Sequence, residues 1–154
     1  QAKTKLGTIN TEKEFIQTDA KNIENWANKL EASEKSVDLI SMWYLIHEIS
    51  ENSVETVVEF LKGIRQRLPK AHLLIGEIVR IDIDTLKVSN SYSIIPEFLL
   101  FHDFSGQGVL KYEELQEIMG KIPYDIVAAK EFDYVENADN EKIPSAIIYY
   151  LEPN

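Results

Sequence analysis

Cysteine is absent from this sequence of 154 residues, which excludes disulfide bonds and metal sites built on thiolates and is compatible with a reducing compartment. Basic residues are also scarce, because 16 Lys and Arg stand against 26 Asp and Glu and give a formal net charge of -10. A protein that binds the nucleic-acid backbone needs a basic surface, so no nucleic-acid partner is expected. We interpret the acidic excess as a solvated surface.

Long apolar runs are missing as well. No run approaches the roughly 20 residues that cross a bilayer, and no charged-then-apolar signal segment opens the chain, so we expect a cytoplasmic protein without a membrane partner. The length is that of one domain with a substantial core. Because internal repeats and Pro/Gly-rich linkers are lacking too, a single unit is predicted.

Short apolar runs alternate with amphipathic patterns along the chain. Strands are predicted at residues 14–20, 37–46, 71–79, 124–132 and 145–152, and helices at 22–32, 52–68, 96–101 and 112–119. Asn52 and Glu55 can form a capping box at the start of the second helix, and Pro69 stops it. The order predicts an α/β fold with a mostly parallel sheet and helices on both faces, to which the closing hairpin adds an antiparallel strand at one end.

Ligands of such open sheets bind beyond the carboxyl ends of the strands. His47 and Glu48 follow the apolar run 37–46, which reads as a strand buried on both faces. A histidine there can take a proton at neutral pH and serve as a general base. The alternative is that His47 only packs or caps the next helix, and the residues alone leave both interpretations open.

Other candidates carry similar alternatives. Glu77 ends the strand 71–79 and can hold a ligand or orient His47. Asp19 can bind an amine or hydroxyl group of a ligand, or it can form a turn or a helix cap. A further set can line an apolar pocket. The alternative is a place in the core for the aromatic residues and on the surface for the histidine: Trp43, Tyr44, Phe98, Phe101, Phe104 and His102.

The stretch His102 to Leu115, HDFSGQGVLKYEEL, has the spacing of a calcium-binding loop. Counted from Asp103, the expected positions hold Asp103, Ser105, Gln107, Gly108, Leu110 and Glu114. Only two of the expected ligands are carboxylates, Lys111 stands at the ninth position, and no second loop of this kind exists. A calcium-binding or scaffolding module without enzymatic activity is therefore the alternative function.

Three of the segments resemble the C-terminal half of a class I S-adenosylmethionine-dependent methyltransferase of the small-molecule O-methyltransferase type. FIQTDA is similar to the third strand of that family, which contacts adenine through residues that match Asp19 and Ala20. VDLISMWYLIHEIS is similar to the fourth-strand motif and matches it at Asp38, His47 and Glu48. AHLLIGEIV is similar to the fifth strand, whose terminal glutamate corresponds to Glu77. The resemblance extends from residue 14 to residue 152.

This resemblance implies transfer of a methyl group from S-adenosylmethionine to a small-molecule acceptor, with a histidine as general base and without a metal. The implied catalytic residues are His47, Glu48 and Glu77. The implied cofactor contacts are Asp19, Ala20, Ser41, Met42 and Trp43, and the implied substrate contacts are Tyr44, Phe98, Phe101 and His102. The family also has a histidine, a glycine loop and an EEL helix start before its last crossover helix. On this interpretation, the stretch HDFSGQGVLKYEEL binds no ion. Its loop glycine allows the chain to turn, and Glu114 interacts favourably with the dipole of the helix that follows.

The sequence departs from the family in three places. Plant-type members carry a lysine where this chain has Trp43, and their second acidic residue beside the base falls near Val109. The third departure is larger, because no glycine-rich turn of the G-x-G type between a strand and a helix is present, and no acidic ribose-binding strand end precedes residue 14. We therefore expect residues 1–154 to be the C-terminal part of a single catalytic domain that apparently lacks its first two strands. A companion chain or a segment before Gln1 would carry the glycine-rich motif, and a homo-oligomer is compatible with the sequence.

Overall fold

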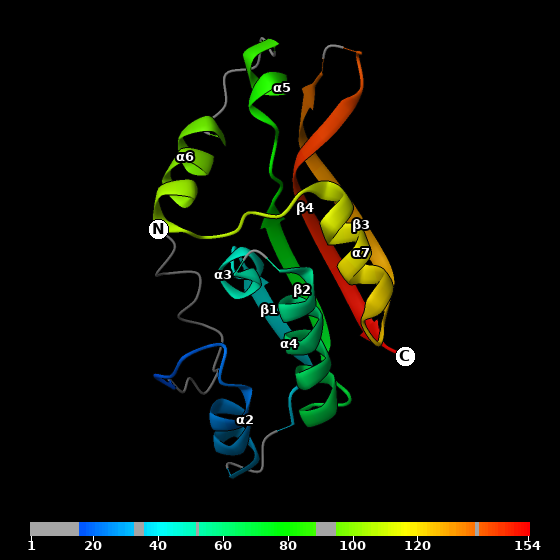
Figure 1. Ribbon diagram of the computed structural model, residues 1–154. Coiled ribbons are helices and arrows are strands. Elements are labelled where there is room, and N and C mark those ends of the chain that lie inside the picture. The colour runs from blue at the N-terminus through cyan, green and yellow to red at the C-terminus, as the bar shows by residue number, and fades with distance from the viewer. Residues whose placement is uncertain (1–15, 33–35, 52, 89–94, 138) are drawn as a thin grey trace, which may run out of the picture.

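A computed structural model describes residues 16–32, 36–51, 53–88, 95–137 and 139–154 of the chain. Its helices are α2 (Ile23–Ala32), α3 (Ile46–Ser50), α4 (Val54–Arg67), α5 (Ile83–Val88), α6 (Ile95–Ser105) and α7 (Tyr112–Lys121). Its strands are β1 (Leu39–Trp43), β2 (His72–Ile78), β3 (Tyr124–Glu136) and β4 (Lys142–Pro153). Figure 1 shows these elements around one sheet.

The four strands form a mixed sheet in the order β1-β2-β4-β3. β1 pairs with β2 in parallel, and β4 pairs antiparallel with both β2 and β3. It follows that β1, β2 and β3 run in the same direction and only β4 is reversed. The predicted Rossmann-like α/β fold, with a mostly parallel sheet and an antiparallel C-terminal strand, is confirmed.

The antiparallel strand lies inside the sheet, and the prediction that it would lie at one end was wrong. Ile147, Tyr149 and Leu151 of β4 are almost fully buried. Most side chains of β3, in contrast, are exposed, and its buried residues are Tyr124 and Val135. The hairpin therefore inserts its more apolar strand next to β2 and leaves its more polar strand at the edge, which buries more apolar surface.

The core lies between one face of the sheet and the helices α4 and α7, which are side by side in Figure 1. The sheet contributes Met42, Leu73 and Ile75 to this core, and the two helices contribute Val57, Leu61, Ile64, Leu115 and Ile118. The strand residues that point to the second face are less covered, since Leu39 is 51% exposed and Trp43 49% exposed. The apolar run predicted a strand buried on both faces. In the described ranges, β1 is buried on one face only, so this prediction was wrong.

The predicted strand 14–20 is not found over its described part. Residues 16–20 form a turn instead, and residues 14 and 15 lie outside the described ranges. The Asp19 carboxylate accepts a hydrogen bond from the Lys21 amide at 2.9 Å, and the Asp19 carbonyl accepts one from the Asn22 amide at 3.1 Å. These hydrogen bonds stabilise a turn and are incompatible with an extended backbone. They outweigh the strand preference of the neighbouring residues.

The predicted strand 37–46 is shortened at both ends, and its last residue, Ile46, belongs to a helix. β1 ends at Trp43, Tyr44 has a left-handed φ of 54°, and α3 starts at Ile46. His47 therefore lies in α3 and not at the strand end. The cause is a contact between residues that are distant in sequence. The Glu77 carboxylate accepts hydrogen bonds from the backbone N–H groups of Ile46 and His47, which have no acceptor within the first turn of this short helix.

The remaining helices mostly match the sequence pattern. α2, α4 and α7 begin and end within two residues of the predictions, α6 is longer than predicted, and α5 was not predicted. Asn52, one half of the predicted capping box, lies outside the described residues, and Ser53 takes the N-cap position of α4. All helices in the described part are too short or too polar to cross a membrane.

Gly76 of β2 makes room for the indole ring of Trp43, its neighbour across the β1–β2 pair. A methyl group in Gly76→Ala would collide with that ring, so we expect Trp43 to move and the free energy of unfolding to fall by about 1–3 kcal/mol. Tryptophan emission and chemical denaturation measure the two effects. Gly120→Ala is the matched control, because a methyl group there meets no atom within 4 Å. Unchanged emission in Gly76→Ala would contradict this packing.

Candidate active site

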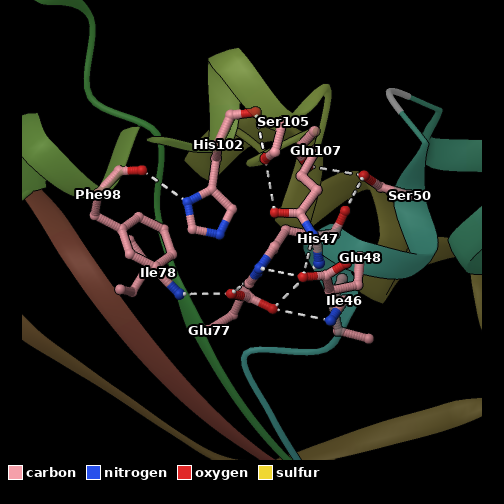
Figure 2. A network of polar contacts seen from close by, with 11 residues as sticks. Ile46, His47, Glu48, Ser50, Glu77, Ile78, Phe98, His102, Ser105 and Gln107 are labelled. Carbon is pink, nitrogen blue, oxygen red and sulfur yellow. Dashed lines mark hydrogen bonds and ion pairs between the residues drawn. The ribbon is translucent and has the colours of Figure 1, made fainter. Parts of the chain in front are cut away.

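The candidate site lies where β1 and β2 end, between α3 and α6. Glu77 is the penultimate residue of β2, and His47 is the second residue of α3. Their side chains are almost fully buried, with 1% of Glu77 and 2% of His47 exposed. Figure 2 shows them at the centre of a network of polar contacts.

The Glu77 carboxylate holds both the ring of His47 and the start of α3. Its Oε1 accepts hydrogen bonds from Nδ1 of His47 at 2.8 Å and from the amide of Ile78 at 2.9 Å. Its Oε2 accepts the amides of Ile46 at 2.9 Å and His47 at 3.3 Å. The bond to Glu77 assigns the proton of His47 to Nδ1, so Nε2 keeps a lone pair that can take a proton or bind a ligand.

The carboxylate of Glu48 lies near Nε2 of His47. Oε1 of Glu48 is 3.7 Å from Nε2 of His47 and also accepts a hydrogen bond from the side-chain amide of Gln107. Gln107 in turn accepts a hydrogen bond from the Ser105 hydroxyl at 3.0 Å. The loop after α6 thus positions Glu48, whose side chain is 42% exposed and reaches solvent.

Two of the predicted substrate residues meet His47 from α6. The rings of His47 and His102 lie 4.8 Å apart between centroids at an angle of 85°, and the ring of Phe98 lies 3.8 Å from that of His102. Nδ1 of His102 donates to the carbonyl of Phe98 at 2.7 Å. Phe101 contacts His102 edge-on at 5.5 Å but is 66% exposed. His102 is buried, so the alternative of a surface histidine is wrong.

The predicted cofactor residues of β1 point to opposite faces of the sheet. Ser41 and Trp43 share the less covered face, where the Trp43 indole donates to the Ser41 hydroxyl at 2.7 Å. Trp43 and Tyr44 line a hollow of about 240 Å³ together with Gly76, Glu77 and parts of β3 and β4. Met42 is buried in the helix-covered core, so its side chain is not available to a ligand in that hollow.

Asp19 and Ala20 lie in the turn before α2. The carbonyl of Ala20 accepts a hydrogen bond from the indole of Trp26 at 3.0 Å. Lys21 forms an ion pair with Glu51, which ties this turn to the residue that follows α3. The turn is thus linked to the helix that carries His47, and contact of Asp19 and Ala20 with adenine stays a prediction.

The candidate calcium ligands have protein partners. Asp103 lies inside α6 and binds Arg80 through two hydrogen bonds of 2.8 and 3.1 Å, which lower the pKa of this carboxyl below its usual value. Glu114 accepts the backbone amide of Lys111 at 2.7 Å at the start of α7, and Gly106 turns the chain with a φ of 73°. The loop glycine and Glu114 therefore have the turning and helix-start roles that the resemblance implied.

Sequence reasoning missed Ser50, which joins α3 to the loop after α6. Its hydroxyl contacts the carbonyl of Gly108 at 2.7 Å and that of His47 at 2.9 Å. It considered Gln107 only as a ligand in the calcium alternative, whereas the side chain of Gln107 holds Glu48. Ser50 and Gly108 are 58 residues apart, so no local signal could have revealed this contact.

No protein-family model matches the chain, and no curated protein matches its sequence. Among solved structures, it is similar to an S-adenosylmethionine-dependent methyltransferase from Anabaena variabilis ATCC 29413, with a TM-score of 0.52, 13% identity, and coverage of 99% of this chain and 64% of that one. The mitomycin 7-O-methyltransferase MmcR gives a TM-score of 0.48 at 11% identity, covering 88% of this chain and 39% of that one. LepI in complex with S-adenosylmethionine gives a TM-score of 0.47 at 7% identity, with coverage of 78% of this chain and 27% of that one.

The chain thus spans less than two thirds of the length of each of these proteins. The identities are too low to carry function, and the similarity concerns the arrangement of helices and strands. The described chain has the Rossmann-like α/β fold of the Anabaena variabilis S-adenosylmethionine-dependent methyltransferase.

Proposed function

We propose that this chain carries the acid–base part of an S-adenosylmethionine-dependent methyltransferase that acts on a small molecule. The observation that supports this most is the buried His47–Glu77 pair at the carboxyl ends of β1 and β2, in a fold shared with one such enzyme. Ligands of this fold class bind at that edge of the sheet. A histidine whose Nδ1 is held by a carboxylate presents Nε2 as a base.

S-adenosylmethionine would supply a methyl group bonded to a positively charged sulfur. An electron pair of the acceptor would form the new bond to the methyl carbon, and the carbon–sulfur bond would break with its electrons left on sulfur. Nε2 of His47 would take the proton that the acceptor releases, and Glu77 would stabilise the resulting imidazolium. Orientation of the reactants can supply about 7–11 kcal/mol, more than the base.

The residues of this chain fit one side of such a cofactor. Trp43 and Tyr44 offer aromatic surface in the hollow beside Glu77. The sequence has no glycine-rich turn between a strand and a helix for close backbone approach, and in the described sheet β1 pairs on one side with β2 only. We therefore propose that a polypeptide with the glycine-rich turn pairs with the free edge of β1 and covers Leu39 and Trp43.

Binding of S-adenosylhomocysteine tests this proposal. We expect the 154-residue chain alone to be poorly soluble and to bind the compound weakly, because no other described segment covers the apolar face and outer edge of β1. A polypeptide with the glycine-rich turn should restore solubility and binding, as measured by light scattering and calorimetry, and the crystal structure of the complex should show adenine beside Asp19 and Ala20.

Three results would contradict parts of this proposal. A monodisperse chain that unfolds cooperatively and binds the compound by itself would remove the need for a companion. Adenine out of contact with Asp19 and Ala20 would remove their assignment, and a completed protein that fails to bind at all would remove the methyltransferase proposal.

A further inference from the structure

We propose that His47, Glu48 and His102 form a binding site for a divalent transition-metal cation. One nitrogen or oxygen donor from each of the three side chains lies within 4.8 Å of the other two. The donors come from two separate elements, because His47 and Glu48 lie on α3 and His102 lies on α6. Among the residues that the structure describes, this is the one cluster of at least three His, Asp or Glu with such spacing.

The Nδ1 atom of each imidazole ring already has a partner, which leaves Nε2 of each ring as the donor for a cation. Nδ1 of His47 is bonded to Glu77 at 2.8 Å, and Nδ1 of His102 is bonded to the carbonyl of Phe98 at 2.7 Å. Since both partners accept hydrogen bonds, the neutral form of each ring carries its proton on Nδ1 and its lone pair on Nε2. In the described chain, no protein group donates a hydrogen bond to Nε2 of His102, although this side chain is only 6% exposed.

The surroundings are those that metal-binding histidines usually have. A ligating imidazole generally donates its other N–H group to a carboxylate or a backbone carbonyl, which orients the ring and strengthens its lone pair. His47 has the carboxylate of Glu77 in this role, and His102 has the carbonyl of Phe98. Glu48 is held by Gln107, as Figure 2 shows, so all three side chains are already oriented before a cation arrives.

The distances require only a small closure around a cation. With metal–ligand bonds of about 2.0–2.2 Å, neighbouring donor atoms lie about 3–3.5 Å apart. Nε2 of His47 and Oε1 of Glu48 are 3.7 Å apart, close to that value. The widest separation, at most 4.8 Å, has to shorten by roughly 1 Å.

The donor set selects the class of cation. Two imidazoles and one carboxylate suit Zn²⁺, Fe²⁺, Co²⁺ and Ni²⁺, whereas Ca²⁺ and Mg²⁺ prefer sites made of oxygen donors. Three protein ligands also leave coordination positions open for water or another small ligand. A bound cation would occupy Nε2 of His47, so it would exclude the proposed proton transfer and inhibit the reaction. The site itself rests on the donor geometry and not on methyl transfer.

Co²⁺ is the probe for the experiment, because its visible absorption reports coordination by nitrogen and oxygen without any methyl acceptor. The full 154-residue chain, with its companion polypeptide if one is needed for solubility, is titrated with Co²⁺. We expect one equivalent to bind, Zn²⁺ to displace it, and an excess of Ca²⁺ to leave it in place. Absence of a Co²⁺ spectrum, or displacement by Ca²⁺, would overturn the proposal.

Substitutions locate the cation. Glu48→Gln and His102→Ala should each weaken Co²⁺ binding at least about tenfold, the lower bound for changes around metal sites. The matched control is His72→Ala, since the imidazole of His72 lies on β2 beside Tyr150 and outside the cluster. Circular dichroism checks folding, and the partly exposed Glu48 position decides the result if His102→Ala unfolds. Unchanged affinity in folded Glu48→Gln, or loss of binding in folded His72→Ala, would refute the site.

Discussion

His47→Ala is expected to lower kcat about 10²- to 10⁴-fold and to leave the affinity for S-adenosylhomocysteine nearly unchanged. The reason is that a general base acts in the transition state, when the acceptor releases its proton, and not in cofactor binding. Nε2 of His47 is the atom concerned, because Nδ1 is bonded to Glu77. The measurement is steady-state transfer of a labelled methyl group by the completed protein, with an acceptor found by screening, alongside calorimetry of S-adenosylhomocysteine binding.

The control for this substitution is His72→Ala, which removes an imidazole from the same chain at a distance from Glu77. It should keep kcat close to that of the unchanged protein. Added imidazole should restore part of the activity of His47→Ala, since a small base can enter the space left by the side chain. Equal activity of His47→Ala and the unchanged protein would mean that methyl transfer here proceeds without this base.

Glu77→Ala is expected to lower the free energy of unfolding by about 3–5 kcal/mol. The substitution leaves the buried Nδ1–H of His47 and the backbone amides of Ile46, His47 and Ile78 without their acceptor. Each buried donor without a partner costs about 1–3 kcal/mol, and water that enters the space can satisfy some of them. Denaturation in urea, followed by circular dichroism, measures the change.

The matched control is Glu59→Ala on α4, which removes an exposed carboxylate whose ion pair with Lys62 lies on the surface. Such pairs contribute about 0–1 kcal/mol, so this variant should unfold almost as the unchanged protein does. If Glu77→Ala were no less stable than Glu59→Ala, the Glu77 carboxylate would not hold α3 in place.

Glu77→Gln separates the structural role of Glu77 from its effect on His47. An amide has one acceptor oxygen, so a glutamine cannot accept hydrogen bonds from both His47 Nδ1 and the amides of α3. If its oxygen faces α3, its NH₂ group faces Nδ1, and the proton of His47 shifts to Nε2. The base would then be lost in a folded protein, which explains why this variant should lower kcat in the same sense as His47→Ala.

The sequence by itself determined most of the regular elements. Helical periodicity predicted α2, α4 and α7, and the apolar runs predicted β2, β3 and β4, because these patterns repeat over the whole length of each element. It also singled out His47, Glu48, Glu77, Phe98 and His102 as candidates. Their types and their places near strand and helix ends were visible in the chain, but their mutual distances were not.

Only the tertiary structure decided where β1 ends, where β4 lies in the sheet and how the candidates meet. β1 ends at Trp43 because Glu77, on another strand, captures the amides of Ile46 and His47 across 30 residues or more. β4 lies next to β2 because it is the more apolar strand of its hairpin. The same long-range packing places His102 beside His47. Local patterns carry no information on such contacts, since they form only when distant segments pack together.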